Sequence, residues 1–216
     1  MSNSNTESYV DRLFRFAVQH REHIIIFFKL LYSVELAILT TSVYLGLTNN
    51  PSFMYVVSIG RRAGDMALLA YIATVIPGIG RRFHYRHKLI SLLMIFRRYT
   101  GIAMFFFAFI HGVVERGIGY LNFGLPNVLP PLFELFGIGA FSLLIPLVIT
   151  SNDRSVQYLK KTWDRIHRLT YVIIWFAAFH IILQGVSFWA LLIGVTLTLQ
   201  VASWINKFRT EKMRRN

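Results

Sequence analysis

Long apolar stretches alternate with short polar segments along the whole chain. Six of them are found, at residues 24–47, 66–80, 100–114, 132–149, 169–183 and 188–205. About 20 apolar residues form one membrane-spanning helix, and long charged side chains at its ends can reach the interface. We therefore expect the second helix to begin near Arg62. The pattern predicts an all-α integral membrane bundle of six transmembrane helices, and the alternative is a re-entrant second stretch.

Composition agrees with a bilayer as the solvent of this chain. Of 216 residues, 55% are hydrophobic and only 15% are charged, and the mean hydropathy is +0.50. A water-soluble domain of this composition would expose too much apolar surface. The chain has no cysteine, which excludes disulfides, iron–sulfur clusters and thiolate ligands and leaves histidine as the main candidate metal ligand.

The basic residues predict an orientation. The net charge is +13, but the charges are divided among short segments, which argues against nucleic-acid binding. The two ends and the second and fourth loops hold 19 Lys and Arg, and the other three loops hold three. The positive-inside rule then places both termini in the cytoplasm. We expect a cytoplasmic N-terminal segment at 1–23, a membrane domain at 24–205 and a basic cytoplasmic tail at 206–216.

Two further expectations concern the first span and the outer face. The polar N-terminus lacks the small-residue cleavage site of a signal peptide, so we expect the first span to be retained and the protein to be a multi-pass inner (plasma) membrane protein. The loop at 117–131 carries three prolines and three glycines, which predicts a structured extracytoplasmic turn without a helix.

Three histidines lie where a bilayer makes them costly. His111 falls inside the third stretch, His180 inside the fifth, and His167 at the start of the fifth. Both stretches run in the same direction, and His111 follows Arg98 by 13 residues as His180 follows His167. At about 1.5 Å per residue, His111 and His180 share one level about 20 Å from the start of each helix. Such a pair suits a bis-histidine haem, and the alternative is a hydrogen bond between helices.

The lower level is less defined, because the third stretch offers arginines where a second histidine would be needed. The step from Arg97 to His111 returns to within about 40° of the same helix face, while the step from Arg98 misses it by about 140°. Arginine stays protonated, so pairing with a haem propionate is the expected role for Arg97, and contact with lipid phosphate is the alternative. Whether His167 holds a second haem stays open.

Other chemistry is sparse in the sequence. Glu35 is the one carboxylate deep in a span, where a proton path, a quinone contact and a hydrogen-bonded interhelical acid are all compatible with it. No glycine-rich nucleotide loop occurs, so electrons are expected from another protein or from quinol.

The sequence resembles the ferric reductase-like transmembrane superfamily, and within it the haem-binding membrane subunits of bacterial methionine sulfoxide reductase systems. The resemblance rests on three stretches between Gly60 and Leu183. They are Gly60-Arg61, then Arg97-Arg98-Tyr99-Thr100-Gly101 followed by His111, and Thr150-Ser151 with Leu159, Lys161, Trp163, His167 and Tyr171 followed by His180. The chain departs from that branch at Lys160, where glycine is usual, and at Asp65, an added charge.

The resemblance implies a b-type cytochrome subunit that passes electrons to an extracytoplasmic reductase such as a molybdenum-containing methionine sulfoxide reductase. The implied donors are a cytoplasmic flavin reductase or membrane quinol, and flavin would come through that partner. The implied cofactor is haem b, one or two per chain. Its candidate binding residues are His111, His180, His167, Arg97 and Arg98, of which the three histidines are the candidate iron ligands. The alternatives are a stand-alone haem ferric or oxygen reductase and a cofactor-free transporter or membrane scaffold.

Overall fold

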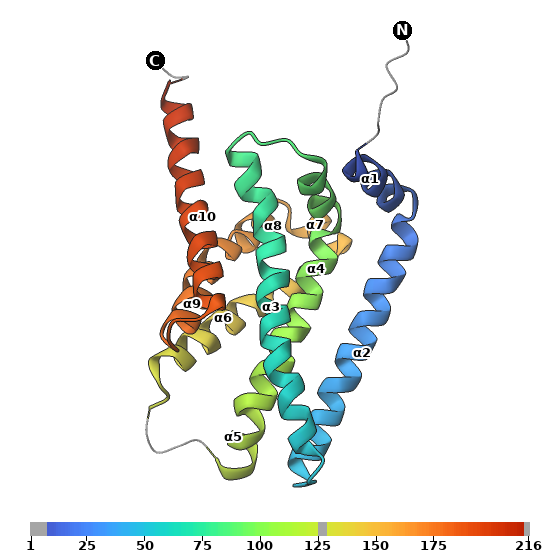
Figure 1. Ribbon diagram of the computed structural model, residues 1–216, viewed down its shortest axis with the longest axis vertical. Coiled ribbons are helices and arrows are strands. Elements are labelled where there is room, and N and C mark those ends of the chain that lie inside the picture. Colours follow the sequence, from blue (N-terminus) through green and yellow to red (C-terminus); the bar gives the residue numbers. More distant parts are fainter. Residues whose placement is uncertain (1–7, 125–128, 214–216) are drawn as a thin grey trace.

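The computed structural model describes residues 8–124 and 129–213, and this part of the chain is helical throughout, without a strand (Figure 1). The helices are α1 (Tyr9–Gln19), α2 (Arg21–Leu47), α3 (Phe53–Arg82), α4 (Lys88–Gly112), the π-helix η1 (Val113–Gly117), α5 (Ile118–Phe123), α6 (Leu132–Ile149), α7 (Asp153–Leu159), α8 (Lys161–His167), α9 (Thr170–Ile182) and α10 (Phe188–Met213).

Five helical segments of the described chain are long and apolar enough to cross a membrane. They are α2, α3, the continuous segment Lys88–Phe123 that begins with α4, α6 and α10. The prediction of an all-helical membrane protein is confirmed. The predicted span that is not among these five is the fifth, at 169–183, which corresponds to α9 and has 13 helical residues. That length gives about 20 Å against a hydrocarbon core of about 30 Å, so a sixth crossing stays a prediction.

α3 is the central helix of the bundle. In its apolar window 56% of the residues are buried inside the protein, against 11–22% in the other four segments, which leave more surface for lipid. Figure 1 shows α3 beside α4 in the middle, with α2 and α10 to either side. Its residues Tyr71, Val75 and Ile79 join the main core with Ile174 of α9 and Ile193 of α10.

The predicted start of the second helix was wrong, and so was the re-entrant alternative. α3 begins at Phe53 and runs unbroken for 30 residues. The apolar turns that precede Arg61 extend the helix, and Gly60 then lets η1 approach closely. A Cβ atom at Gly60 would lie 2.5 Å from the Val114 side chain, which is closer than packing allows.

The predicted loop at 117–131 was wrong over its first part, because Ile118–Phe123 is helical. The π-helix η1 shifts the direction of the chain after α4, and α5 then packs back on the end of α2. Asn122 donates a hydrogen bond of 3.0 Å to the Gly46 carbonyl, and the Ile118 side chain fills the space beside Gly46. Residues 125–128, with Pro126, lie outside the described part.

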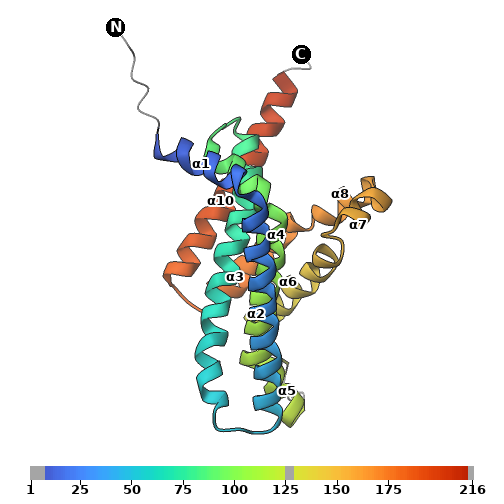
Figure 2. The same cartoon turned by 90° about the vertical axis from the view of Figure 1, so that its right-hand side faces the viewer.

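α1, the turn from α3 to α4 and the last turns of α10 lie at one end of the molecule, and α5 lies at the other (Figures 1 and 2). We call the first the basic end, because Arg86, Lys88, Lys207, Arg209 and Lys212 belong to it.

Candidate functional site: a histidine pair and a basic cavity

The structure brings His111 of α4 and His180 of α9 together inside the bundle. Their ring centroids are 6.3 Å apart and the ring planes stand at 76° to each other. Both side chains are half-buried. The two helices come from sequence positions 69 residues apart, so this approach is a product of the tertiary fold.

Each of these rings is oriented by a backbone carbonyl of a neighbouring helix. His111 Nδ1 lies 3.0 Å from the Gly60 carbonyl oxygen on α3, and His180 Nδ1 lies 2.7 Å from the Phe133 carbonyl oxygen on α6. A carbonyl can only accept, so each Nδ1 carries the proton and donates it. This tautomer leaves the Nε2 lone pair to accept or to bind a metal, as in metal-ligating histidines. Nε2 of His180 lies 3.4 Å from the Gln184 amide nitrogen, so metal ligation there requires Gln184 to move aside.

Two glycines make these hydrogen bonds possible. Gly64 follows Gly60 by four residues on α3, and Gly137 follows Phe133 by four residues on α6. A Cβ atom at Gly64 would lie 2.8 Å from His111 Nδ1, and one at Gly137 would lie 2.7 Å from His180 Nδ1. In a helix the side chain of residue i+4 lies over the carbonyl of residue i. The missing side chain therefore opens each carbonyl to an imidazole.

The spacing of the pair fits a single metal ion between the rings. An imidazole nitrogen lies about 2 Å from its metal and about 1.1 Å from its own ring centre, so two opposed imidazoles have centroids about 6.3 Å apart. Neutral imidazole is a suitable ligand for iron, and two histidines at this spacing would be the protein ligands of a haem.

A buried carboxylate, that of Glu134, lies next to the Phe133 carbonyl that His180 contacts. Glu134 follows Phe133 in the first turn of α6 and is buried. Its carboxylate accepts a hydrogen bond from the Tyr120 hydroxyl of α5 and lies 3.3 Å from Nε of Arg116 in η1. The π-helix and α5 are thus fastened to α6 beside His180.

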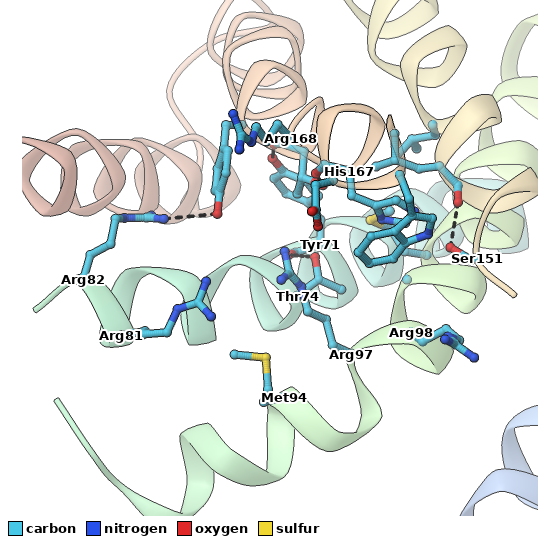
Figure 3. Close-up of a pocket in the computed structure, with 18 of the residues that line it drawn as sticks. Tyr71, Thr74, Arg81, Arg82, Met94, Arg97, Arg98, Ser151, His167 and Arg168 are labelled. Carbon is cyan, nitrogen blue, oxygen red and sulfur yellow. Dashed lines mark hydrogen bonds between the residues drawn. The ribbon is translucent and has the colours of Figure 1, made fainter. Parts of the chain in front are cut away.

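A second feature is a cavity of about 1030 Å³ nearer the basic end. Its lining comes from α3, α4, α6, α8, α9 and α10 and holds more basic than acidic side chains. Figure 3 shows Arg97 pointing from α4 toward Tyr71, Thr74 and His167, whereas Arg98 turns away. Arg98 instead forms an ion pair of 2.6 Å with Asp153. Within the described residues no carboxylate pairs with Arg97, so the cavity presents a free positive charge.

His167 is held differently from the other two histidines. Its ring stacks on Trp163 at 4.0 Å, and its Nε2 lies 3.1 Å from the Thr150 hydroxyl oxygen. Burial, and then the positive charge of Arg97, lower the pKa of His167 below its ordinary value, which favours the neutral ring. Because Nε2 is already bonded, metal ligation at this nitrogen requires the Thr150 contact to break.

Arg82, a second basic residue of the cavity, is buried at the end of α3. Its guanidinium donates to Ser203 at 2.8 Å and Gln200 at 2.7 Å on α10, and to the Tyr171 hydroxyl at 3.2 Å on α9. It also lies 4.9 Å from the centre of the Trp204 ring. These partners are neutral, so none of them offsets the positive charge of Arg82 beside the cavity.

Glu35 lies apart from both features. Its side chain is 1% exposed, and neither carboxylate oxygen has a hydrogen-bond partner among the described residues. It does not line the cavity.

The structure therefore groups the predicted site residues in two places. His111 and His180 face each other, His167 and Arg97 share the cavity, and Arg98 is tied to Asp153. Their roles as ligands stay predictions. Gly64 and Gly137 were not predicted from the sequence. Each lies four residues after the carbonyl that its histidine contacts, and this becomes recognisable only when the contacting helices are known. Arg82 was not predicted either, and no such spacing marks it.

The fold and this site define a class: an all-helical membrane protein with a carbonyl-oriented histidine pair in its interior. Residues 63–178 match the family of ferric reductase-like transmembrane components, and the chain belongs to that family. The matched segment contains His111 and His167 and ends two residues before His180.

Two curated relatives show how far the similarity extends. The magnetosome protein MamZ of Magnetospirillum gryphiswaldense is 38% identical over 100 residues, which cover 44% of this chain and 15% of MamZ. The protein-methionine-sulfoxide reductase heme-binding subunit MsrQ of Brucella ovis is 31% identical over 101 residues, which cover 45% of each chain. The chain thus spans less than half the length of the relatives it matches. No solved structure matched.

Proposed function

We propose that this protein is a membrane cytochrome subunit that carries electrons across the bilayer on haem b held by His111 and His180. The observation that carries the proposal is the pair itself, with Nδ1 of both rings bonded to backbone carbonyls and centroids 6.3 Å apart. The relatives named as heme-binding subunits support the same cofactor.

The chain's own residues would hold the cofactor. A bound haem supplies one-electron chemistry at its iron. The Gly60 and Phe133 carbonyls fix the tautomer and orientation of each imidazole, which keeps Nε2 of both rings available as the ligating atom.

We further propose that the basic end is cytoplasmic, so that both termini lie in the cytoplasm, and that the chain crosses the membrane six times, with α9 as the fifth span. Electrons would enter at this end from a flavin reductase or quinol. They would leave at the opposite face to an extracytoplasmic reductase, such as a molybdenum-containing methionine sulfoxide reductase. The gathering of Lys and Arg at one end and the names of the Brucella relatives support this direction.

The basic cavity is the place for a second anionic cofactor in this scheme. Its volume of about 1030 Å³ and the unpaired Arg97 suit the carboxylates of a second haem, with Arg97 on a propionate. His167 would ligate this haem only after releasing Thr150.

The visible spectrum of the purified protein tests the proposal. We expect a Soret band that is lost or strongly shifted in His111→Ala and in His180→Ala. His23→Ala, which removes a surface histidine at the start of α2, is the matched control and should leave the band unchanged. Haem per chain, measured together with the spectrum of His167→Ala, decides between one site and two.

Two results would contradict the proposal. A wild-type protein without a Soret band, or a band indifferent to both His111→Ala and His180→Ala, removes the haem assignment. Rapid ferric or oxygen reduction by the purified chain without any acceptor protein would replace the subunit role with a stand-alone reductase.

A further inference from the structure

The short helix α1 carries an apolar strip that the rest of the protein does not cover. Ala17 is 4% exposed and packs the helix onto the bundle. Tyr9, Leu13 and Phe16 are 84%, 48% and 59% exposed. Their spacing of four and then three residues places them on one face of the helix. Ala17 follows Leu13 by four residues, so this buried residue lies at one edge of the same apolar face, and the rest of that face is open.

The position of α1 is fixed relative to two membrane-crossing helices. It ends at Gln19, and α2 starts at Arg21. Figure 2 shows α1 lying across the direction of α2 at the basic end, without continuing it. An ion pair of 2.7 Å joins Asp11 to Lys88, the first residue of α4. Because α2 and α4 belong to segments long and apolar enough to cross a membrane, a helix that lies across their ends runs along the membrane surface.

The surroundings of the strip are those of a membrane surface. The lipid-exposed side chains of α2 begin in its second turn, where Ile26 and Phe27 are 52% and 62% exposed. Arg12 borders the strip, with its guanidinium 4.6 Å from the centre of the Tyr9 ring. An aromatic apolar face flanked by arginines is typical of helices that lie in the interface and meet anionic headgroups.

We propose that α1 is an interfacial anchor that inserts Tyr9, Leu13 and Phe16 between the lipids of the leaflet at the basic end and contacts anionic phospholipid headgroups through its arginines. The continuity with the lipid-facing surface of α2 and the charge of the flanking residues select the bilayer as the occupant. The anchor stands independently of the haem proposal.

The absence of cysteine from the chain makes a direct test possible. Leu13→Cys and Gln19→Cys, each in the full chain, receive a nitroxide spin label and are placed in nanodiscs that contain phosphatidylglycerol and phosphatidylcholine. Gln19 is the matched control, because it is exposed on the same helix about 120° away from Leu13. Collision of the label with oxygen and with a water-soluble nickel complex is measured by electron paramagnetic resonance.

We expect the label at position 13 to favour oxygen over the nickel complex by at least about threefold relative to position 19, as for a site below the headgroups. The contrast should shrink in discs of phosphatidylcholine alone. Phe16→Cys gives a second reading of the same strip if Leu13→Cys misfolds.

Equal access of the nickel complex to positions 13, 16 and 19 would overturn the anchor. Protection at 13 and 16 only after a cytoplasmic protein is added would overturn it in favour of a protein partner. A contrast that is the same with and without phosphatidylglycerol would overturn the headgroup contact.

Discussion

Each histidine of the pair packs against a glycine, where any larger residue would place a Cβ atom in the space of the imidazole. Gly64 and Gly137 place no Cβ where the imidazoles of His111 and His180 lie. A glycine in the interior of a helix is less stable than alanine by roughly 0.5–1 kcal/mol, so an alanine would be favoured if helix stability alone mattered. The glycines are explained by the access that they give to two carbonyls.

Gly64→Ala and Gly137→Ala should each weaken haem binding while keeping the helices. The added Cβ overlaps the imidazole and must displace it, and overpacking costs about 1–3 kcal/mol, or about fivefold to hundredfold in affinity. Haem retention in titration with a competing apoprotein measures the change. Gly112→Ala is the control, because a Cβ there meets no atom within 4 Å although it adjoins His111. Unchanged retention in both glycine variants would contradict the proposed orientation of the rings.

At the scale of elements, one side chain fastens α3 to α9 and α10. Arg82 reaches Ser203 and Gln200 on α10 and Tyr171 on α9, and Asn206 of α10 donates back to the Arg82 carbonyl at 3.0 Å. The planar guanidinium donates hydrogen bonds from three nitrogen atoms to three partners, and the single nitrogen of a lysine ammonium group cannot reach all three.

Arg82→Lys should therefore destabilise the protein although the charge is kept. Loss of hydrogen bonds to a charged buried group costs about 2 kcal/mol, which for a chain of this size lowers the Tm by about 4–8 °C. Thermal unfolding in detergent, followed by circular dichroism, measures the shift. Arg81→Lys, at the exposed neighbouring position, is the control and should shift the Tm by less than about 2 °C. Equal shifts in the two variants would show that the network contributes nothing.

At the scale of the whole molecule, the number of crossings decides where the two ends lie. An even number places the start of α1 and the end of α10 on one side of the membrane, and an odd number places them on opposite sides. The structure sets both at the basic end (Figure 1), and α9 is the helix on which the count depends.

Single cysteines in the otherwise cysteine-free chain resolve the count. With six spans, a membrane-impermeant maleimide applied to intact cells should label Asn50→Cys and Ser187→Cys and spare Ser8→Cys and Glu211→Cys. The spared positions should react after permeabilisation, which is the internal control. Labelling of Glu211→Cys but not Ser187→Cys in intact cells would show that α9 does not cross.

The sequence by itself determined the class of the molecule and its candidate residues. Runs of apolar residues report burial in lipid without reference to any partner, so the all-helical membrane fold was readable. A histidine inside such a run stands out for the same reason, which is how His111 and His180 were found. The length of α3 and the helix at Ile118–Phe123 were not readable, because Gly60 and Gly46 show their packing role only beside the helices that contact them.

Only the tertiary structure decided how these residues are used. In the folded protein the two rings lie 6.3 Å apart, and their Nδ1 atoms contact the Gly60 and Phe133 carbonyls. His167 contacts Thr150, and Arg98 forms an ion pair with Asp153. Each of these pairings except that of His167 with Thr150 joins positions 47 to 69 residues apart along the chain. Helical periodicity fixes the face on which a side chain lies, but which carbonyl it meets depends on the crossing of two helices, and that is set by packing over the whole bundle.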